Sequence, residues 1–383
     1  MFTRLIIVSL LLLILSGCAH TPAVQATAPP PMLQPTSLPT TAPPTLPLAT
    51  APPIAPLAAT VRPAADIAAE IDTFISTVTE KGMFNGFVLV DRDGGVIFSK
   101  GYGLADREKQ TPITGRTRFY IGSLTKQFAA AAIMLLEEEG KLSVQDSMCQ
   151  HLPQCPAAWQ PITIHHLLTH TAGLPDSLGL PYTRPATPAE LRTAIEQLPL
   201  LSKPGARFEY SDAGYILAGL IMEQVSGQPY GEFLQERIFN PAGMADSGYG
   251  DGGEQLAVGY LYAAASTKSP PFEPTRDYAA GGVYSTAEDL LRWDQALYAD
   301  TPLTAASRER LFTPYTVVDE AEYGYGWFIT GEPDHRLISH GGSGSGFQTE
   351  LACHVDDQVT IIVLANQDTA SPPAITRQIF RII

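Results

Sequence analysis

The sequence predicts an α+β fold in which an antiparallel sheet is built from the N- and C-terminal parts and flanked by helices, with a mostly helical subdomain between them. Residues 85–90 and 95–99 alternate apolar and polar side chains around an Asp-Gly-Gly turn, as a β-hairpin does. Three further strand-like segments lie near the C-terminus, and helical periodicity dominates the region between. An apolar sheet face must be covered, so helices are expected to pack on it.

The first eighteen residues predict a targeting segment. Arg4 precedes an apolar run over 5–15 that is too short to span a bilayer comfortably. The following Leu-Ser-Gly-Cys resembles a bacterial lipoprotein signal, in which Cys18 becomes the lipidated first residue of the mature protein. An ordinary signal peptide with an incidental cysteine is the alternative. The lipoprotein interpretation places the protein in the cell envelope, exported and lipid-anchored to a bacterial membrane rather than spanning it.

Residues 19–63 are rich in Pro, Ala and Thr, and residues 20–63 contain no Asp, Glu or Lys. Such a composition cannot bury a core, and its prolines favour an extended conformation. We expect a disordered, semi-rigid tether with a contour length on the order of 130 Å. Residues 64–383 are expected to form the folded domain. The net charge of -15 argues against nucleic acid as a partner and against electrostatic docking to anionic lipid.

Within the folded domain, helices and strands are predicted from the periodicity of apolar residues, from helix-capping residues and from turn residues. Residues 187–190 form a capping box with proline at the first helical position, Asp212 is expected to cap a helix that ends near Gly227, and residues 285–288 open another helix. The predicted helices cover 66–81, 121–140, 187–198, 212–227, 285–297 and the segment from 371 onward, and the late strands cover 336–339, 348–354 and 359–366.

The cysteines and histidines give no metal or cofactor motif. Cys149 and Cys155 are close in sequence in an exported protein, so a disulfide that closes a small loop is possible. Cys353 is expected to be buried in a strand. A cluster of three histidines invites a metal interpretation but lacks suitably spaced carboxylates; it comprises His165, His166 and His170. We expect neither a metal nor a cofactor.

Ser123 and Lys126 form a Ser-x-x-Lys motif on one face of the predicted 121–140 helix. A serine at a helix N-terminus lies among unpaired backbone N–H groups, which suit a developing oxyanion. A lysine one turn later could take the serine proton if its pKa falls from about 10.4. The alternative is that Ser123 only caps the helix and Lys126 is solvated, because the motif alone is common.

Two further motifs follow in order, Tyr210-Ser211-Asp212 and His340-Gly341-Gly342-Ser343. With connecting sequences such as residues 119–126, they resemble the β-lactamase-related serine hydrolases, in the branch of class C β-lactamases, D-aminopeptidases and penicillin-binding-protein-like esterases. The resemblance covers about residue 67 to the C-terminus. It implies the β-lactamase/transpeptidase-like fold, with the active site between the sheet and the helical part.

The resemblance also implies roles for individual residues. Ser123 would be the nucleophile of an acyl-enzyme, and Lys126 and Tyr210 would share the general-base work. Nearby cations are expected to lower the pKa of Tyr210. The backbone N–H groups of Ser123 and Ser343 would form the oxyanion hole. Glycines in the third motif, Gly341 and Gly342, would let this strand approach the substrate closely.

Two departures from the family pattern bear on the substrate, for which the expected binding residues are Asp212, His340, Gly341, Gly342 and Ser343. Asp212 replaces the usual asparagine; facing Lys126, it would raise the lysine pKa and shift base duty toward Tyr210, although it could simply cap the helix. His340 replaces the usual lysine, and a mostly neutral imidazole binds a substrate carboxylate less well.

These departures favour ester or peptide bonds as substrates, in small molecules or peptides. The alternatives within the same chemistry are a D,D-carboxypeptidase acting on cell-wall peptides and a β-lactamase. An alternative of a different class is a non-catalytic protein that uses the cleft to hold peptidoglycan or a peptide.

Overall fold

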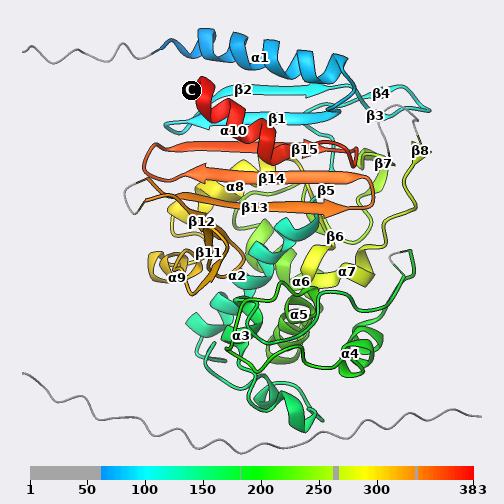
Figure 1. Cartoon of the computed structure of the whole chain (residues 1–383), viewed down its shortest axis with the longest axis vertical. Coiled ribbons are helices and arrows are strands. Elements are labelled where there is room, and N and C mark those ends of the chain that lie inside the picture. The colour runs from blue at the N-terminus through cyan, green and yellow to red at the C-terminus, as the bar shows by residue number, and fades with distance from the viewer. Residues whose placement is uncertain (1–61, 182, 262–266, 333–334) are drawn as a thin grey trace, which may run out of the picture. The chain divides into compact units, whose positions relative to one another are not determined.

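The computed structural model describes residues 62–181, 183–261, 267–332 and 335–383 (Figure 1). The predicted signal, Cys18 and residues 19–61 of the predicted tether lie outside the described residues. Within the described ranges, no helix combines the length and apolar content that crossing a membrane requires.

The predicted antiparallel sheet is present and has eight strands in the order β10-β11-β12-β13-β14-β15-β1-β2. Strand β1 pairs with β15 from Gly86↔Ala365 to Arg92↔Val359, so strands from the two ends of the folded unit lie side by side in the sheet. The strands are β1 (Gly86–Arg92), β2 (Gly95–Tyr102), β10 (Thr316–Val318), β11 (Ala321–Tyr323), β12 (Phe328–Thr330), β13 (Leu337–Gly344), β14 (Phe347–His354) and β15 (Val359–Ala365).

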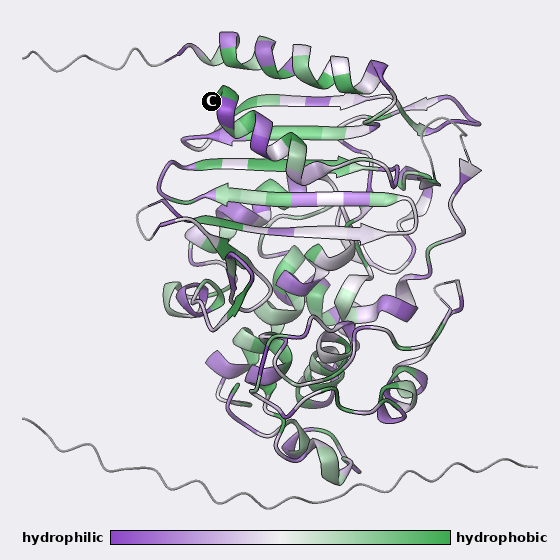
Figure 2. Cartoon of the chain, viewed as in Figure 1, coloured by the Kyte–Doolittle hydropathy of each residue, from purple (hydrophilic) through white to green (hydrophobic). Residues whose placement is uncertain are grey.

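Both faces of the sheet are covered, which explains why β1 and β15 are almost continuously apolar. Val88 and Val90 point toward helices α1 (Ala64–Glu80) and α10 (Pro372–Ile382). Alternate residues of β1 belong to the larger core on the other face, where α8 (Ala287–Tyr298) contacts β1 and β15. Helix α1 is apolar toward the sheet and polar on its outer side (Figure 2).

The helical part centres on α2 (Thr125–Glu138), which packs against α5 (Asp212–Ser226) and α7 (Pro274–Gly281). Every α2 residue from Thr125 to Leu136 is buried, so this helix is the core of the helical part rather than an amphipathic cover. The other α-helices are α3 (Ile164–Leu168), α4 (Pro188–Glu196), α6 (Tyr230–Leu234) and α9 (Ala305–Leu311).

Short strands outside the main sheet connect the two parts. Strand β9 (Val283–Ser285) pairs with both β5 (Phe119–Tyr120) and β6 (Gly248–Tyr249). Strand β5 ends shortly before Ser123 in the sequence. Two minor pairs are β3 (Leu104–Asp106) with β4 (Thr111–Pro112) and β7 (Tyr260–Leu261) with β8 (Thr267–Lys268).

Helix caps agree with the sequence at α4 and differ by one residue at two other helices. The Thr187–Glu190 capping box is formed, with Pro188 opening the helix. At α5, however, Ser211 rather than Asp212 is the N-cap, because its hydroxyl accepts the backbone N–H of Gly214 at 3.1 Å. At α8 the cap is Thr286, the second residue of the predicted 285–288 motif.

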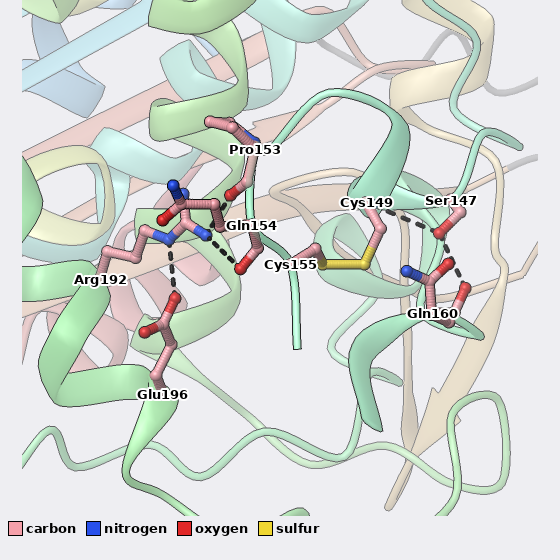
Figure 3. The surroundings of a disulfide bond; sticks show 8 residues. All are labelled: Ser147, Cys149, Pro153, Gln154, Cys155, Gln160, Arg192 and Glu196. Atoms are coloured by element: carbon pink, nitrogen blue, oxygen red, sulfur yellow. Dashed lines mark hydrogen bonds and ion pairs between the residues drawn. A yellow bond between two sulfur atoms is a disulfide. The ribbon is translucent and has the colours of Figure 1, made fainter. Parts of the chain in front are cut away.

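Cys149 and Cys155 form a disulfide, which answers the question left open by their spacing (Figure 3). The guanidinium of Arg192 on α4 donates to the backbone carbonyls of Pro153 and Gln154 inside this loop. The disulfide loop is therefore tied to α4. Cys353 is free and buried in β14, as predicted.

Candidate active site

Ser123 lies in a 3₁₀ turn, Gly122–Leu124, that leads directly into α2. Gly122 has a φ of 53°, and a Cβ there would lie 2.8 Å from the backbone nitrogen of Ser343. Only glycine satisfies both the backbone angle and this close approach. The Thr349 hydroxyl also donates to the Ile121 carbonyl at 2.8 Å, so the turn is held against strands β13 and β14.

The amine of Lys126 is completely buried and makes three hydrogen bonds. Its Nζ donates to Ser123 Oγ at 3.0 Å, to Asp212 Oδ1 at 2.8 Å and to the Ala280 carbonyl at 3.0 Å. These three acceptors match the three donors of an ammonium group. The alternative of a solvated Lys126 is wrong, and the Ser123 hydroxyl makes no capping hydrogen bond in this turn.

The Lys126 pKa results from opposing effects. Burial lowers it, but the negative charge of Asp212 and the interaction with Tyr210 together outweigh burial, so the pKa lies above its ordinary value. Lys126 is therefore an ammonium in the resting site. This is the effect expected if Asp212 faced the lysine, and the ion pair with its 2.8 Å distance is the reason.

Tyr210 lies beside Lys126, with its ring centroid 4.8 Å from Lys126 Nζ, and it lines the same pocket as Ser123. The Lys126 charge does lower the pKa of Tyr210, as expected, but the net pKa lies above its ordinary value. Burial raises this pKa, and the charge of Lys126 only partly offsets it. The phenol is consequently neutral in the resting site.

Behind Tyr210, two buried histidines are joined by one tyrosine hydroxyl. The His170 ring accepts the Ser211 N–H at Nδ1, 3.0 Å away, so its Nε2 carries the proton and donates to the Tyr323 hydroxyl at 3.2 Å. The His340 Nδ1 donates to the Gly341 carbonyl at 2.6 Å, so its Nε2 accepts from Tyr323 at 3.1 Å. Both histidines are neutral in this arrangement.

This network positions Tyr210. The His170 ring lies against the Tyr210 ring with centroids 4.3 Å apart, while its Nδ1 holds the next residue, Ser211. The sequence alone does not reveal this role, because there His170 is only one of three clustered histidines that lack carboxylates spaced for a metal. His165 instead contacts the Tyr325 hydroxyl at 2.8 Å, and His166 closes the α3 capping box. Among the described residues, no three potential ligands are grouped to hold a metal.

His340 does not occupy the position expected of a substrate-binding residue. Its side chain is buried, lies against Phe328 and Tyr323, and does not line the pocket above Ser123. Burial and the charge of Lys126 lower its pKa to about 3. Gly342 is also internal, because a Cβ there would lie 1.9 Å from the Ile121 carbonyl oxygen. Of the expected binding residues, Asp212 and Ser343 line the pocket.

The pocket above Ser123 has a volume of about 370 Å³. Its walls come from the loop after α3, the start of α5, the end of α7 and the end of β13. The lining residues are Ser123, Asp176, Tyr210, Asp212, Asp277, Ala280, Gly281, Ser343, Gly344 and Ser345.

The sequence is similar to known proteins over most of its length. Residues 58–382 match the family model described as Beta-lactamase. Penicillin-binding protein 4* of Bacillus subtilis (strain 168) is 33% identical over 324 residues, covering 78% of this chain and 71% of that protein.

Solved structures give the same result for the fold. A penicillin binding protein from Bacillus halodurans superposes with a TM-score of 0.72 at 30% identity, covering 81% of this chain and 99% of that one. A D-amino acid amidase from Ochrobactrum anthropi SV3 superposes with a TM-score of 0.72 at 24% identity, covering 83% and 97%, and this second likeness concerns the fold alone.

Proposed function

This chain belongs to the beta-lactamase family, and we propose that it is a serine hydrolase that cleaves an ester or amide bond through an acyl-enzyme on Ser123. One observation carries the proposal. A single buried amine, Lys126 Nζ, contacts both the Ser123 hydroxyl and the Asp212 carboxylate at hydrogen-bonding distance, with the Tyr210 phenol beside them. This is the arrangement of a nucleophile with its proton acceptors.

In the first step, Ser123 Oγ bonds to the substrate carbonyl carbon and its proton passes to the Lys126–Tyr210 pair. The backbone N–H groups of Ser123 and Ser343 would stabilise the oxyanion, and the close approach of the Gly122 turn to β13 supports this role. The bond to the leaving alcohol or amine then breaks as that group takes up a proton. Water next attacks the acyl carbon and releases the acid, which restores Ser123.

The resting protonation states set a requirement for this step. Lys126 is an ammonium and Tyr210 a neutral phenol, so neither can accept the serine proton until one of them is deprotonated. Loss of a proton from Lys126 to solvent leaves a neutral amine 3.0 Å from Ser123 Oγ, and this amine can take the proton of Ser123. We therefore expect the rate of acylation to rise with pH.

Esters and peptides are proposed ahead of β-lactams and cell-wall D,D-peptides as substrates. Among the described residues that line the pocket, there is no lysine, arginine or histidine side chain to meet a substrate carboxylate. The similarity to penicillin-binding protein 4* favours the second candidate, a D,D-carboxypeptidase or β-lactamase that penicillin would acylate.

Covalent labelling tests the proposal. A fluorophosphonate probe should attach one molecule to Ser123 of the folded protein, seen as an increase in protein mass. The Ser123→Ala variant should not be labelled. Hydrolysis of p-nitrophenyl esters should be lost in the same variant by at least about a thousandfold. Labelling of Ser123 by a fluorescent penicillin would support the second candidate. Folded wild-type protein that no probe labels would instead point to a non-catalytic peptidoglycan- or peptide-binding protein.

We also propose that the protein is exported and anchored by a lipid on Cys18, with residues 19–63 as a tether between the membrane and the hydrolase domain. The sequence pattern before Cys18 supports this. In a bacterial host fed an alkyne-bearing fatty acid, the wild-type protein should become labelled and should sediment with the membranes. The Cys18→Ser variant should carry no label and should remain in the supernatant. An unlabelled wild-type protein would contradict the anchor.

A further inference from the structure

The pocket above Ser123 is acidic. Three aspartates line it, and its other lining residues carry no charge in the resting site. They come from separate segments: Asp176 from the loop after α3, Asp212 from the start of α5 and Asp277 from α7. The fold therefore gathers negative charge at this pocket from three places along the chain.

Two of these charges are balanced by cations and the third is not. Asp212 pairs with Lys126 at 2.8 Å, and Asp277 pairs with buried Arg276 at 2.5 Å. Asp176 accepts the backbone N–H of Asp212 at 3.2 Å, but it makes no ion pair with any residue that the structure describes. The carboxylate is exposed at the pocket rim, where a ligand can reach it.

The electrostatic environment of Asp176 favours an incoming cation. Burial of part of the group and the negative charge of Asp212 both raise its pKa, although Lys126 and Arg276 lower it. Residues 343–345, which also line the pocket, offer serine hydroxyls and glycine backbone but no charge. A substrate carboxylate would meet the unbalanced negative charge, whereas an ammonium group would neutralise it.

We propose that Asp176 selects substrates that carry an ammonium group beside the reacting carbonyl, such as amino-acid esters or amides with a free amine. The inference rests on the proposed acyl-enzyme at Ser123 and adds a substrate class to it. Asp176 acts as a specificity residue, holding the positive end of the substrate while its carbonyl carbon lies at Ser123 Oγ. Anionic acyl groups are disfavoured by the same charge.

The test uses three phosphonate p-nitrophenyl esters that differ only in one terminal group: trimethylammonium, the isosteric neutral tert-butyl, or carboxylate. Second-order rate constants for labelling Ser123 are measured on the full chain. At low ionic strength the cationic probe should label about tenfold faster than the neutral one, and the anionic probe should be the slowest. Added salt should reduce the cationic advantage, since the carboxylate is exposed.

Asp176→Asn should remove most of the rate ratio between the cationic and neutral probes, and the variant's labelling by the neutral probe verifies that it is folded. Asp319→Asn, at an exposed turn between β10 and β11, is the matched control and should retain the ratio.

Each alternative outcome decides the question. Equal labelling by all three probes would overturn the inference and leave the hydrolase proposal standing. An unchanged ratio in Asp176→Asn would overturn the assignment to this residue. Complete absence of label on Ser123 would overturn both proposals.

Discussion

At the scale of the residue, the site depends on a buried charge that is fully hydrogen-bonded. An isolated ammonium at a completely buried position would lose its proton or destabilise the fold. Asp212 supplies the compensating charge at 2.8 Å, and it also sits in the first turn of α5, where the helix dipole favours a carboxylate. An asparagine at 212 would provide the hydrogen bond without the charge.

The first prediction concerns Asp212→Asn. Without the carboxylate, the pKa of Lys126 should fall, so the rising limb of the pH–rate profile should move to lower pH. The unfolding free energy should decrease by about 3 kcal/mol near neutral pH, where a charged Lys126 would remain unpaired. Stopped-flow acylation and urea unfolding measure the two effects.

Ser211→Ala is the control for Asp212→Asn, because it removes the true α5 cap. It should lower stability by about 1 kcal/mol and leave the position of the limb unchanged. An Asp212→Asn profile identical to wild type would show that Asp212 does not tune Lys126.

The second prediction concerns acid stability and His340. Its folded-state pKa of about 3 lies below the ordinary value of 6.5, so between these values the unfolded chain binds more protons. The contribution of His340 to stability is thus present above pH 6.5 and is lost as pH falls toward 3, by up to about 1.4 kcal/mol per pH unit. His340→Gln should flatten this part of the curve, measured by urea unfolding at several pH values.

The matched control is His335→Gln, because His335 is exposed. It should retain the acid dependence of the wild type. If His340→Gln also retained the full slope, the buried neutral state of His340 would be disproved.

The spacing and types of residues predicted that Ser123, Lys126 and Tyr210 share one site. They did not predict the protonation states of Lys126 and Tyr210. The direction of the Tyr210 pKa depends on desolvation, which appears only once the ring is packed against His170. For the same reason, the sequence could identify His340 as a departure from the family pattern but could not reveal that its ring is buried and does not line the pocket.

At the scale of the element, local signals located the helices and strands well and their ends less well. The Asp93-Gly94 turn, with φ of 56° and 75°, matches the predicted hairpin. Strand β13, however, runs on through the glycines to Gly344, five residues beyond its predicted end at 339. Pairing with β14 along its whole length outweighs the weak strand propensity of glycine, and pairing partners are distant in sequence.

The third prediction concerns the disulfide loop. Replacing both cysteines, Cys149→Ser with Cys155→Ser, should lower the unfolding free energy by roughly 2 kcal/mol, because a short loop is no longer closed in the unfolded chain. The rate constants for ester hydrolysis should be unchanged, since no residue of the loop lines the pocket above Ser123. Thermal unfolding and p-nitrophenyl ester assays measure the two.

Adding a reductant provides the control for the disulfide prediction. It should destabilise the wild type by a similar amount and leave the double variant unaffected. Equal stability of wild type and double variant would contradict a structural role for the bond.

At the scale of the whole molecule, the sheet pairs segments that are separated in sequence by nearly the full length of the folded domain. Alternating side chains on β1 and β15 serve two cores, one beneath α1 and α10 and one shared with the helical part. The sequence predicted that both ends supply strands, but the strand order could not be derived from local patterns. The pairing of β1 with β15 joins two strands whose side chains fill both cores.

This arrangement separates stability from chemistry, because the core beneath α1 and α10 shares no residue with the lining of the pocket above Ser123. The fourth prediction is that Ile379→Ala, at a completely buried position of α10, lowers the unfolding free energy by about 3 kcal/mol. The hydrolysis rate per folded molecule, counted by labelled Ser123, should be unchanged at 25 °C.

Arg381→Ala lies on the exposed side of the same helix and provides the matched control. It should alter stability by less than about 0.5 kcal/mol. If Ile379→Ala instead reduced the turnover of each labelled molecule while Arg381→Ala did not, the outer core would be coupled to the site through the sheet. Independence of the two would mean that α10 stabilises the β1–β15 pairing and has no part in positioning Ser123, Lys126 or Tyr210.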